Sequence, residues 1–395
     1  MGRMNRLARE NTRFKGNIPV LTASEMVSNT GWNMQMVIWQ PYLLSLGARI
    51  PTLGLLQSCS TLMRGTLLLI TGRIADSVGR KLLMILASSL TIVGMVLAIV
   101  ANHWVLIVPT IILWAIGGSF WEPAFRAMVA ESVEPRNRGT AYGLLGLTWF
   151  LPGLYAPAIA GYIGEVLGPR VVITIMVLTE SVSLSMIILW VRETLKEKMK
   201  SSSKAISFIT DLLKQARSQP KFYTAAIIHR FQGAMGEGIF LGILLTTFSF
   251  DLLQLGLLAN IYSAATSILQ IPMGKISDRY GRKNLLILSV TIKIIAFIGY
   301  LLSNNFPSIL LSHAVNAISD AIYIPTFNAY LAGLESSAGM ATRFGSLQGL
   351  MALITFPAPI LGSQLFNIYG FQIFIMSTAL LAAGSLAAFT RLKPI

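Results

Sequence analysis

Long apolar segments alternate with short polar loops along the whole 395-residue chain. A transmembrane helix needs about 20 mostly apolar residues to cross about 30 Å of hydrocarbon, and twelve segments meet that requirement. An even number of spans leaves both ends of the chain on one side, so the pattern predicts an all-α membrane protein. The predicted spans cover residues 18–46, 51–73, 81–101, 104–128, 138–166, 170–191, 222–248, 252–275, 283–303, 306–331, 341–367 and 370–390.

Composition supports this prediction. Hydrophobic residues make up 54% of the chain and charged residues only 12%, whereas a soluble domain has about 25% charged residues. The first 17 residues are polar and basic, so we expect no cleavable signal peptide. Cys59 is the single cysteine, which excludes an internal disulfide and a cysteine metal cluster.

Positive charges gather in one set of loops and account for the net charge of +15. They occupy the N-terminal arm, the loops that follow even-numbered spans, and the C-terminal segment. The opposite loops contain only Arg49 and Arg170. Because positive loops remain cytoplasmic, we expect a multi-pass protein of the cell membrane with both termini in the cytoplasm. The basic charge suits anionic lipid headgroups, and we expect no nucleic-acid partner.

An internal repeat relates the two halves of the chain at an offset of 202 residues. GRIADSVGRK begins at Gly72, and GKISDRYGRK begins at Gly274. The same offset relates Leu53-Gly54-Leu55-Leu56 to 255–258, Pro123-Ala124-Phe125 to 325–327, and Ala156-Pro157 to 358–359. A repeat of this length is typical of transporters, whose substrate site lies at the interface of the repeats.

The repeat predicts two six-span halves. The first covers residues 1–191, including a basic arm over 1–17, and the second covers 222–395. Residues 192–221 join them, and apolar residues at helical spacing between 206 and 216 predict a short amphipathic helix on the membrane surface.

The two decapeptides resemble the signature of the major facilitator superfamily, Gly-x-x-x-Asp-Arg/Lys-x-Gly-Arg/Lys-Arg/Lys. The first copy departs from it only at Ser77, and the second, with Arg279, fits throughout. The resemblance implies two pseudo-symmetric six-helix bundles, secondary transport by alternating access, and a latch that closes the cytoplasmic side. The latch residues would be Gly72, Asp76, Gly79, Arg80, Lys81, Gly274, Asp278, Gly281, Arg282 and Lys283.

Span 5 is similar to an element of the twelve-span drug:proton antiporter branch. Residues 156–161 read APAIAG, where that branch has Gly-Pro-x-x-Gly-Gly. Leu113 departs from the branch, which has an arginine four residues before the glycine equivalent to Gly117. Small residues and prolines allow close packing and bends in spans 5 and 11. The packing residues would be Pro157, Gly161, Pro359 and Gly362.

Among the ionisable residues of the predicted spans, eleven are expected to lie within the hydrocarbon. Each costs at least ~2.5–3.5 kcal/mol in hydrocarbon, so such groups usually face a cavity. Eight lie on spans 1, 4, 7 and 10, which line the central cavity in the family that the chain resembles. With polar and aromatic neighbours, the candidate proton or substrate residues are Glu25, Asn29, Trp32, Asn33, Arg64, Glu122, Arg126, His229, Arg230, Glu237, His313, Asn316, Asp320 and Tyr323.

Depth and spacing suggest partners for some of these charges. Glu25 and Arg64 lie at similar depth on neighbouring spans, so they could form a static ion pair; alternatively, Glu25 exchanges a proton or binds a cation. Glu122 and Arg126 are four residues apart and are expected to pair at a gate or structural site.

Span 7 carries Arg230 and Glu237, which are seven residues apart and are each expected to partner a charge on another helix. Asp320 is the second candidate carboxylate, and His313 is expected to be an ordinary hydrogen-bonded histidine. Glu180 and Lys293 lie on spans 6 and 9 and have no assigned role beyond a cross-helix pair or a lateral opening.

No metal-ligand cluster or nucleotide-binding glycine loop is present in the sequence, so we expect neither an enzyme nor a cofactor. Desolvated carboxylates favour protons as the coupling ion. The sequence predicts a monomeric secondary transporter that exports amphipathic or cationic small molecules in exchange for protons. Proton-coupled uptake or facilitated diffusion of a sugar, organic acid or other metabolite is the alternative, and a sensor that binds without transporting is a third possibility.

Overall fold

The computed structural model describes residues 16–134, 138–195, 217, 219–333 and 349–392, and the description below is confined to them. Helices dominate these ranges, and no strand occurs within them. The predicted amphipathic helix of the linker lies outside the described residues.

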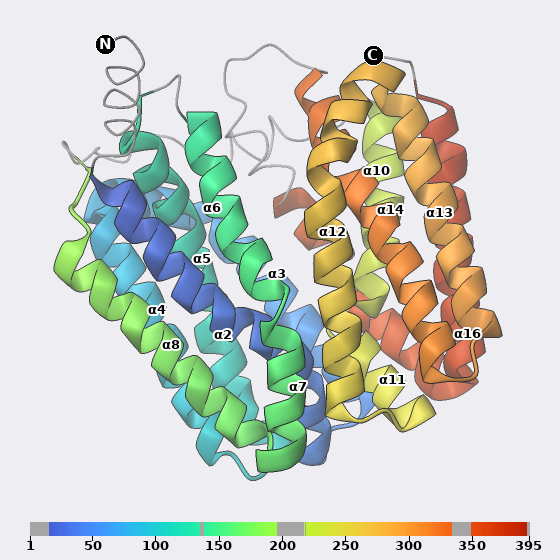
Figure 1. The fold of residues 1–395 in the computed structure, drawn as a ribbon, viewed down its shortest axis with the longest axis horizontal. Coiled ribbons are helices and arrows are strands. Elements are labelled where there is room, and N and C mark those ends of the chain that lie inside the picture. Colours follow the sequence, from blue (N-terminus) through green and yellow to red (C-terminus); the bar gives the residue numbers. More distant parts are fainter. Residues whose placement is uncertain (1–15, 135–137, 196–216, 218, 334–348, 393–395) are drawn as a thin grey trace, which may run out of the picture.

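The helices form two bundles that follow the two halves of the chain (Figure 1). The first bundle contains α2 (Asn17–Ser45), α3 (Ile50–Val78), α4 (Arg80–Val100), the 3₁₀ turn η1 (Trp104–Ile107), α5 (Val108–Glu131), α6 (Arg138–Gly153), α7 (Ala156–Leu167) and α8 (Pro169–Trp190). The second contains α10 (Pro220–Gly236), α11 (Phe240–Phe248), α12 (Leu252–Tyr280), α13 (Arg282–Leu302), α14 (Phe306–Gly333) and α16 (Ala358–Thr390).

These helices occupy the positions of the twelve predicted spans, but some spans are broken. Span 5 divides into α6 and α7 just after Pro152, and span 7 divides into α10 and α11 with a bend of 44°. The long α16 holds the end of span 11 and all of span 12, because Gly370 turns the chain between them at φ 79°. A conformation with positive φ is open to glycine at little cost.

Seven of the described helices are long and apolar enough to cross a membrane, and the bent pair α10–α11 makes eight. The helices α2, α3 and α14 are absent from this set although each is long enough. Their inward-facing polar side chains, such as Asn29 and Asp320, lower their mean hydropathy. A polar stripe on an otherwise apolar helix is expected where the helix lines a cavity.

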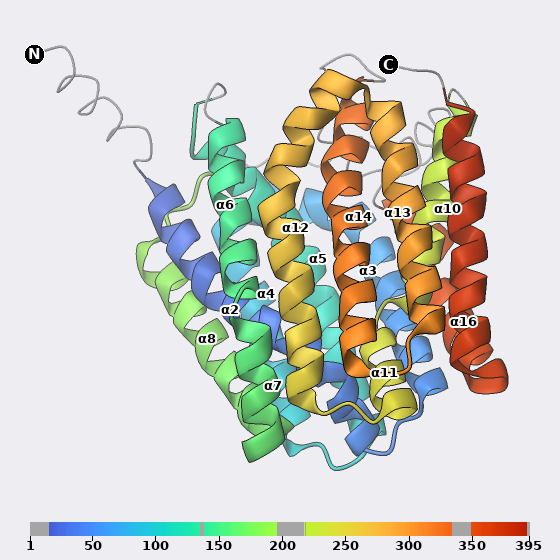
Figure 2. The ribbon, with the colours of Figure 1, turned by 45° about the vertical axis from the view of Figure 1, so that its right-hand side comes forward.

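The bundles pack together at one end and diverge toward the other. We call the end where α2 begins and α16 finishes the terminal end, and the opposite end the distal end. The helices α6 and α12 separate toward the terminal end in both views (Figures 1 and 2). At the distal end α7 packs on α12, and α3 packs on α16.

Glycines allow this distal contact to be close. A Cβ atom built on Gly256 of α12 would lie 2.6 Å from the carbonyl oxygen of Pro157. One built on Gly161 of α7 would collide with the carbonyl oxygen of Leu252. Pro157 and Gly161 therefore lie in the contact between the bundles, whereas Gly362 packs on Met235 within the second bundle.

Candidate functional site

Two cavities lie between the helices, one in each bundle. The cavity of the first bundle, which we call the N-lobe, has a volume of about 680 Å³. The cavity of the second bundle, the C-lobe, has a volume of about 670 Å³. Four residues line both of them, so the lobes adjoin near the middle of the protein. These residues are Gln35, Trp39, Gln57 and Gly238.

Tryptophans form one wall of the N-lobe. The ring centroids of Trp32 and Trp114 are 5.4 Å apart in an edge-to-face arrangement, and those of Trp39 and Trp114 are 4.4 Å apart. Trp121 stacks on Phe125 at 5.7 Å on the same cavity. The indole rings come from α2 and α5, and they give the N-lobe a broad aromatic surface.

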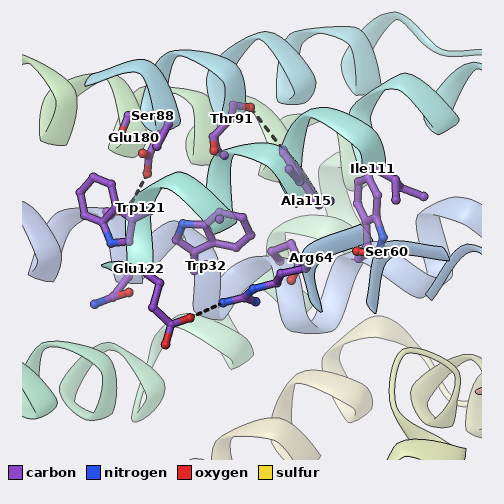
Figure 3. A pocket seen from close by; sticks show the side chains of 18 of the residues that line it. Trp32, Ser60, Arg64, Ser88, Thr91, Ile111, Ala115, Trp121, Glu122 and Glu180 are labelled. Carbon is purple, nitrogen blue, oxygen red and sulfur yellow. Dashed lines mark hydrogen bonds and ion pairs between the residues drawn. The ribbon is translucent and has the colours of Figure 1, made fainter. Parts of the chain in front are cut away.

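Two carboxylates lie in the N-lobe without a basic partner. Ser28 donates a hydrogen bond of 2.6 Å to Glu180, which is 5% exposed. Asn29 faces Glu25, with 3.5 Å between the amide nitrogen and the carboxylate, and donates to Thr148 at 3.1 Å. Among the described residues, neither acid forms an ion pair with a lysine or arginine. Figure 3 shows Glu180 next to Ser88 at one side of this cavity.

The ion pair expected between Glu25 and Arg64 is wrong. Arg64 instead contacts Glu122 at 3.0 Å (Figure 3), and Arg126 contacts the same carboxylate at 2.9 Å. The reason is the helix arrangement: α3 packs mainly on α5 and α16, while α2 packs on α8, α6 and α7. Spans 1 and 2, although adjacent in sequence, are therefore not close neighbours in space. The pair of Glu122 with Arg126 forms as expected.

A buried ion pair lies in the C-lobe. Lys293 of α13 contacts Asp320 of α14 at 2.7 Å, and their side chains are only 7% and 14% exposed. The hydroxyl of Tyr262 donates to the other carboxylate oxygen at 2.9 Å. Lys293, for which the sequence supplied no definite role, thus neutralises the second candidate carboxylate.

Rings surround this pair. The hydroxyl of Tyr300 lies 2.6 Å from Nδ1 of His313, as expected for an ordinary hydrogen-bonded histidine. His229 stacks on Tyr323 with ring centroids 3.8 Å apart. These residues and Asn316 line the C-lobe.

Arg230 and Glu237 pair with each other at 2.8 Å rather than with charges on other helices, which corrects the sequence expectation. The helix α10 ends at Gly236, so Glu237 lies outside it, in the bend that leads to α11. A seven-residue separation is two helical turns only while the helix continues. Both side chains are about half exposed, at 48% and 42%.

Asn33 does not line either cavity, in contrast to its predicted place on the cavity wall. It is 1% exposed and donates to the backbone carbonyls of Asn29 at 2.8 Å and Trp149 at 3.3 Å. Its role is contact between α2 and α6. Gln40, seven residues later, lines the C-lobe and accepts a hydrogen bond from the N–H of Gly242.

The decapeptides lie at the terminal end, where α3 passes into α4 and α12 into α13. Arg80 is nearly buried, donates to the carbonyl of Ala75 at 2.5 Å, and contacts Glu131 at 3.1 Å. Arg282 donates to the carbonyl of Ala329 at 2.7 Å. These contacts stay within each bundle. The side chains of Asp76 and Asp278 and the surroundings of Gly72 and Gly274 lie outside the described part of the protein.

Glu193, just after α8, is a residue of this region that the sequence did not suggest. Its carboxylate accepts hydrogen bonds from the N–H groups of Arg80 at 3.1 Å and Lys81 at 3.0 Å, the first residues of α4. A Cβ atom built on Gly79 would lie 2.7 Å from this carboxylate. A glycine at this position therefore leaves room for Glu193 to cap α4. Partial burial raises the pKa of Glu193, but backbone N–H donors outweigh it and hold the pKa below its ordinary value.

We expect Glu193→Gln to destabilise the protein at neutral pH by about 1 kcal/mol, the typical cost of a weakened helix cap. The native pKa lies below the ~4.3 of an unfolded glutamate, so the carboxylate stabilises fully above that pH and loses its effect as the pH falls through the native value. The difference in unfolding temperature between wild type and variant should therefore shrink between pH 7 and pH 3. A difference that stays constant over this range would contradict the capping role.

Comparison with known proteins identifies the family to which the chain belongs. A family model described as Major Facilitator Superfamily matches residues 21–244 and 230–394. The multidrug resistance protein MdtG of Proteus mirabilis is 23% identical over 312 residues, covering 78% of this chain and 77% of its own. The multi-drug resistance efflux pump PmrA of Streptococcus pneumoniae is 25% identical over 348 residues, with 84% of each chain covered.

Solved structures show the same fold. A bacterial homologue of the human lysosomal transporter Spinster, in an inward-facing unoccupied conformation, superposes with a TM-score of 0.78 at 14% identity, covering 94% of this chain and 95% of its own. The human organic anion transporter MFSD10 superposes with a TM-score of 0.70 at 15% identity, covering 94% and 98%. The chain therefore belongs to the Major Facilitator Superfamily and is a multi-pass membrane transporter, not an enzyme.

Proposed function

We propose that this transporter exports amphipathic cations from the cell in exchange for protons. The named relatives MdtG and PmrA are multidrug proteins, which supports export of foreign compounds. Among the described residues, lysines and arginines gather at the terminal end, as at the starts of α4 and α13, and the positive-inside rule favours the cytoplasm for such an end. With the bundles packed at the distal end, the described state is then open toward the cytoplasm, ready to take up a compound for export.

The observation that carries the substrate class is the N-lobe itself. Three tryptophans, Trp32, Trp39 and Trp114, stand on the same cavity as two acids that lack a basic partner in the described structure. The face of an indole ring attracts cations, and an aromatic wall accepts flat apolar groups. Carboxylates removed from water favour any positive charge that can neutralise them.

Competition for these acids supplies the coupling. A cation bound near Glu25 and Glu180 neutralises them when the cavity faces the cytoplasm. Protons do so when the cavity faces the opposite side and the cation has left. The carrier changes conformation most easily when its acids are neutralised, by the cation or by protons, because bare charges are costly in a low-dielectric cavity. The inward movement of protons therefore drives the outward movement of the cation. The other charged residues of the N-lobe are Glu122 and its two partners, Arg64 and Arg126, and together they carry a net charge of +1.

A polar C-lobe favours a second candidate, uptake of a hydroxylated metabolite. Gln232 and Asn316 line this cavity, and their amide oxygens have no hydrogen-bond partner among the described residues. Such acceptors suit hydroxyl groups. The charges beside them are already paired, so this lobe gives less reason to expect a charged ligand.

Binding to the purified protein separates these candidates. We expect a radiolabelled lipophilic cation to bind the protein in nanodiscs. Trp32→Leu should weaken this binding about 30-fold, since aromatic contacts to a desolvated cation are worth about 2 kcal/mol. Trp190→Leu is the matched control, because Trp190 is 58% exposed at the end of α8 and lines neither cavity.

Neutral sugars and organic acids should leave the cation in place. Tight binding of a sugar or acid, with no measurable cation binding, would contradict the proposed substrate class and favour uptake of a metabolite.

A further inference from the structure

The helices α7 and α16 each begin inside a predicted span without a side-chain cap of their own. The helix α7 starts after the break at Leu154 and Tyr155. Its first backbone bond runs from the N–H of Ile159 to the carbonyl of Tyr155 at 3.1 Å. Pro157 has no N–H, and the N–H of Ala158 has no backbone acceptor in the first turn of the helix. Such orphan donors at helix starts need a partner.

The partner comes from the other bundle. Asn260 of α12 accepts a hydrogen bond of 2.8 Å from the N–H of Ala158. Its amide nitrogen donates to the carbonyl of Leu154 on the far side of the break. One side chain of the second bundle thus holds both sides of the break between α6 and α7.

The same arrangement recurs at α16, with the bundles exchanged. The first backbone bond of α16 runs from the N–H of Leu361 to the carbonyl of Pro357 at 3.0 Å, and Pro359 has no N–H. The N–H of Ile360 donates to the hydroxyl of Ser58, on α3 of the first bundle, at 3.3 Å. Ser58 is 1% exposed.

The two contacts are related by the sequence repeat. Ser58 and Asn260 are 202 residues apart, as are their partners Ala158 and Ile360. A glycine one turn before each cap allows the approach: a Cβ atom on Gly256 would lie 2.6 Å from the carbonyl of Pro157, and one on Gly54 would lie 2.5 Å from that of Pro359. Each bundle therefore contributes a glycine and a capping side chain to the broken helix of the other bundle.

We propose that Asn260 and Ser58 are positioning residues of the transport cycle, which cap the broken helix of the opposite bundle and must release it before the distal end opens. Both contacts lie where the bundles meet, and no opening that separates α7 from α12 and α3 from α16 can keep them. Asn260, with two bonds, holds more strongly than Ser58, with one longer bond. The inference rests on alternating access as proposed above and on no assumption about the substrate.

Spin labels at the distal end measure this opening directly. Val100 and Leu302 end α4 and α13, are 70% and 75% exposed, and are themselves related by the repeat. The variant Val100→Cys/Leu302→Cys in a Cys59→Ser background carries one label on each bundle. Double electron–electron resonance measures the distance between the two labels in lipid nanodiscs. At a pH where a short and a long distance are both populated, it gives the ratio of the two populations.

We expect Asn260→Ala to raise the long-distance population relative to the short one about fivefold, which is about 1 kcal/mol and typical of a lost cap. Ser58→Ala should raise it about twofold, and the double variant more than either. Asn260→Ser, which recreates the hydroxyl cap of the first repeat, should restore part of the closed population. Ser185→Ala removes a hydroxyl that bonds only within α8 and should change nothing.

An unchanged distance ratio in a folded Asn260→Ala protein, or an equal shift in Ser185→Ala, would overturn the proposal. If Asn260→Ala fails to fold, Asn260→Ser and Ser58→Ala provide the same comparison. Failure of the proposed function is distinguishable, because a protein that moves no cation can still show the shift in distances, and one that moves cations can lack it.

Discussion

Glu25→Gln is expected to abolish proton-driven transport and to weaken cation binding about 100-fold. Glutamine keeps the size of the side chain and can still contact Asn29, but it can neither release a proton nor attract a cation. Removing one partner of a buried charge contact typically costs 2–5 kcal/mol, and 100-fold is about 2.7 kcal/mol. Flux and equilibrium binding in the same reconstituted preparation measure the two effects separately.

Two further glutamates serve as comparisons for this result. Glu180→Gln should also uncouple transport, because Glu180 lines the same cavity and accepts its hydrogen bond from Ser28. Glu165→Gln should leave transport intact, since Glu165 lines neither cavity and bonds the N–H of Leu252, which an amide oxygen also accepts. Full proton-driven flux in Glu25→Gln, or equal loss in Glu165→Gln, would remove Glu25 from the coupling site.

Lys293→Met is expected to destabilise the protein by about 3–5 kcal/mol, because it leaves the carboxylate of Asp320 buried without its partner. The double variant Lys293→Met/Asp320→Asn should recover most of that loss, since replacing both partners of a buried pair is often nearly neutral. Chemical unfolding in detergent, followed by fluorescence, gives the free energies of unfolding.

The exposed pair of Arg230 and Glu237 is the matched control for this cycle. Arg230→Gln should cost less than about 1 kcal/mol, because a half-exposed pair is well solvated. Equal losses of unfolding free energy for Lys293→Met and Arg230→Gln, or no recovery in the double variant, would show that burial of the Lys293–Asp320 pair does not affect stability.

The spans, the repeat and the family could be read from the sequence, because they depend on long apolar segments and on a motif present twice. The breaks within spans could not. Pro152 permits a bend in span 5, but the side chain that bonds both sides of the break belongs to Asn260, which is more than 100 residues away. Likewise, the bend after Gly236 was not predicted, although Gly238 adopts a positive φ of 74° within it.

The candidate residues were found from charge and spacing, but among their ion pairs only that of Glu122 with Arg126 was predicted correctly. Arg64 reaches Glu122 and not Glu25 because helix neighbours in space differ from neighbours in sequence. Lys293 pairs with Asp320 on α14, the next helix in sequence, and spacing alone did not identify this pair because it depends on which faces of α13 and α14 pack together. A signal for Ser58 and Asn260 was nevertheless present: both fall at the 202-residue offset, one turn after Gly54 and Gly256, and the repeat comparison could have extended to them.

Flux of a lipophilic cation into inside-out vesicles or proteoliposomes under an imposed pH gradient tests the proposed exchange most directly. With the interior acidic, we expect the cation to accumulate against its own concentration gradient, and accumulation to collapse when a protonophore removes the pH gradient. Equilibration that ignores the pH gradient, or cation movement in the same direction as protons, would contradict proton-coupled export.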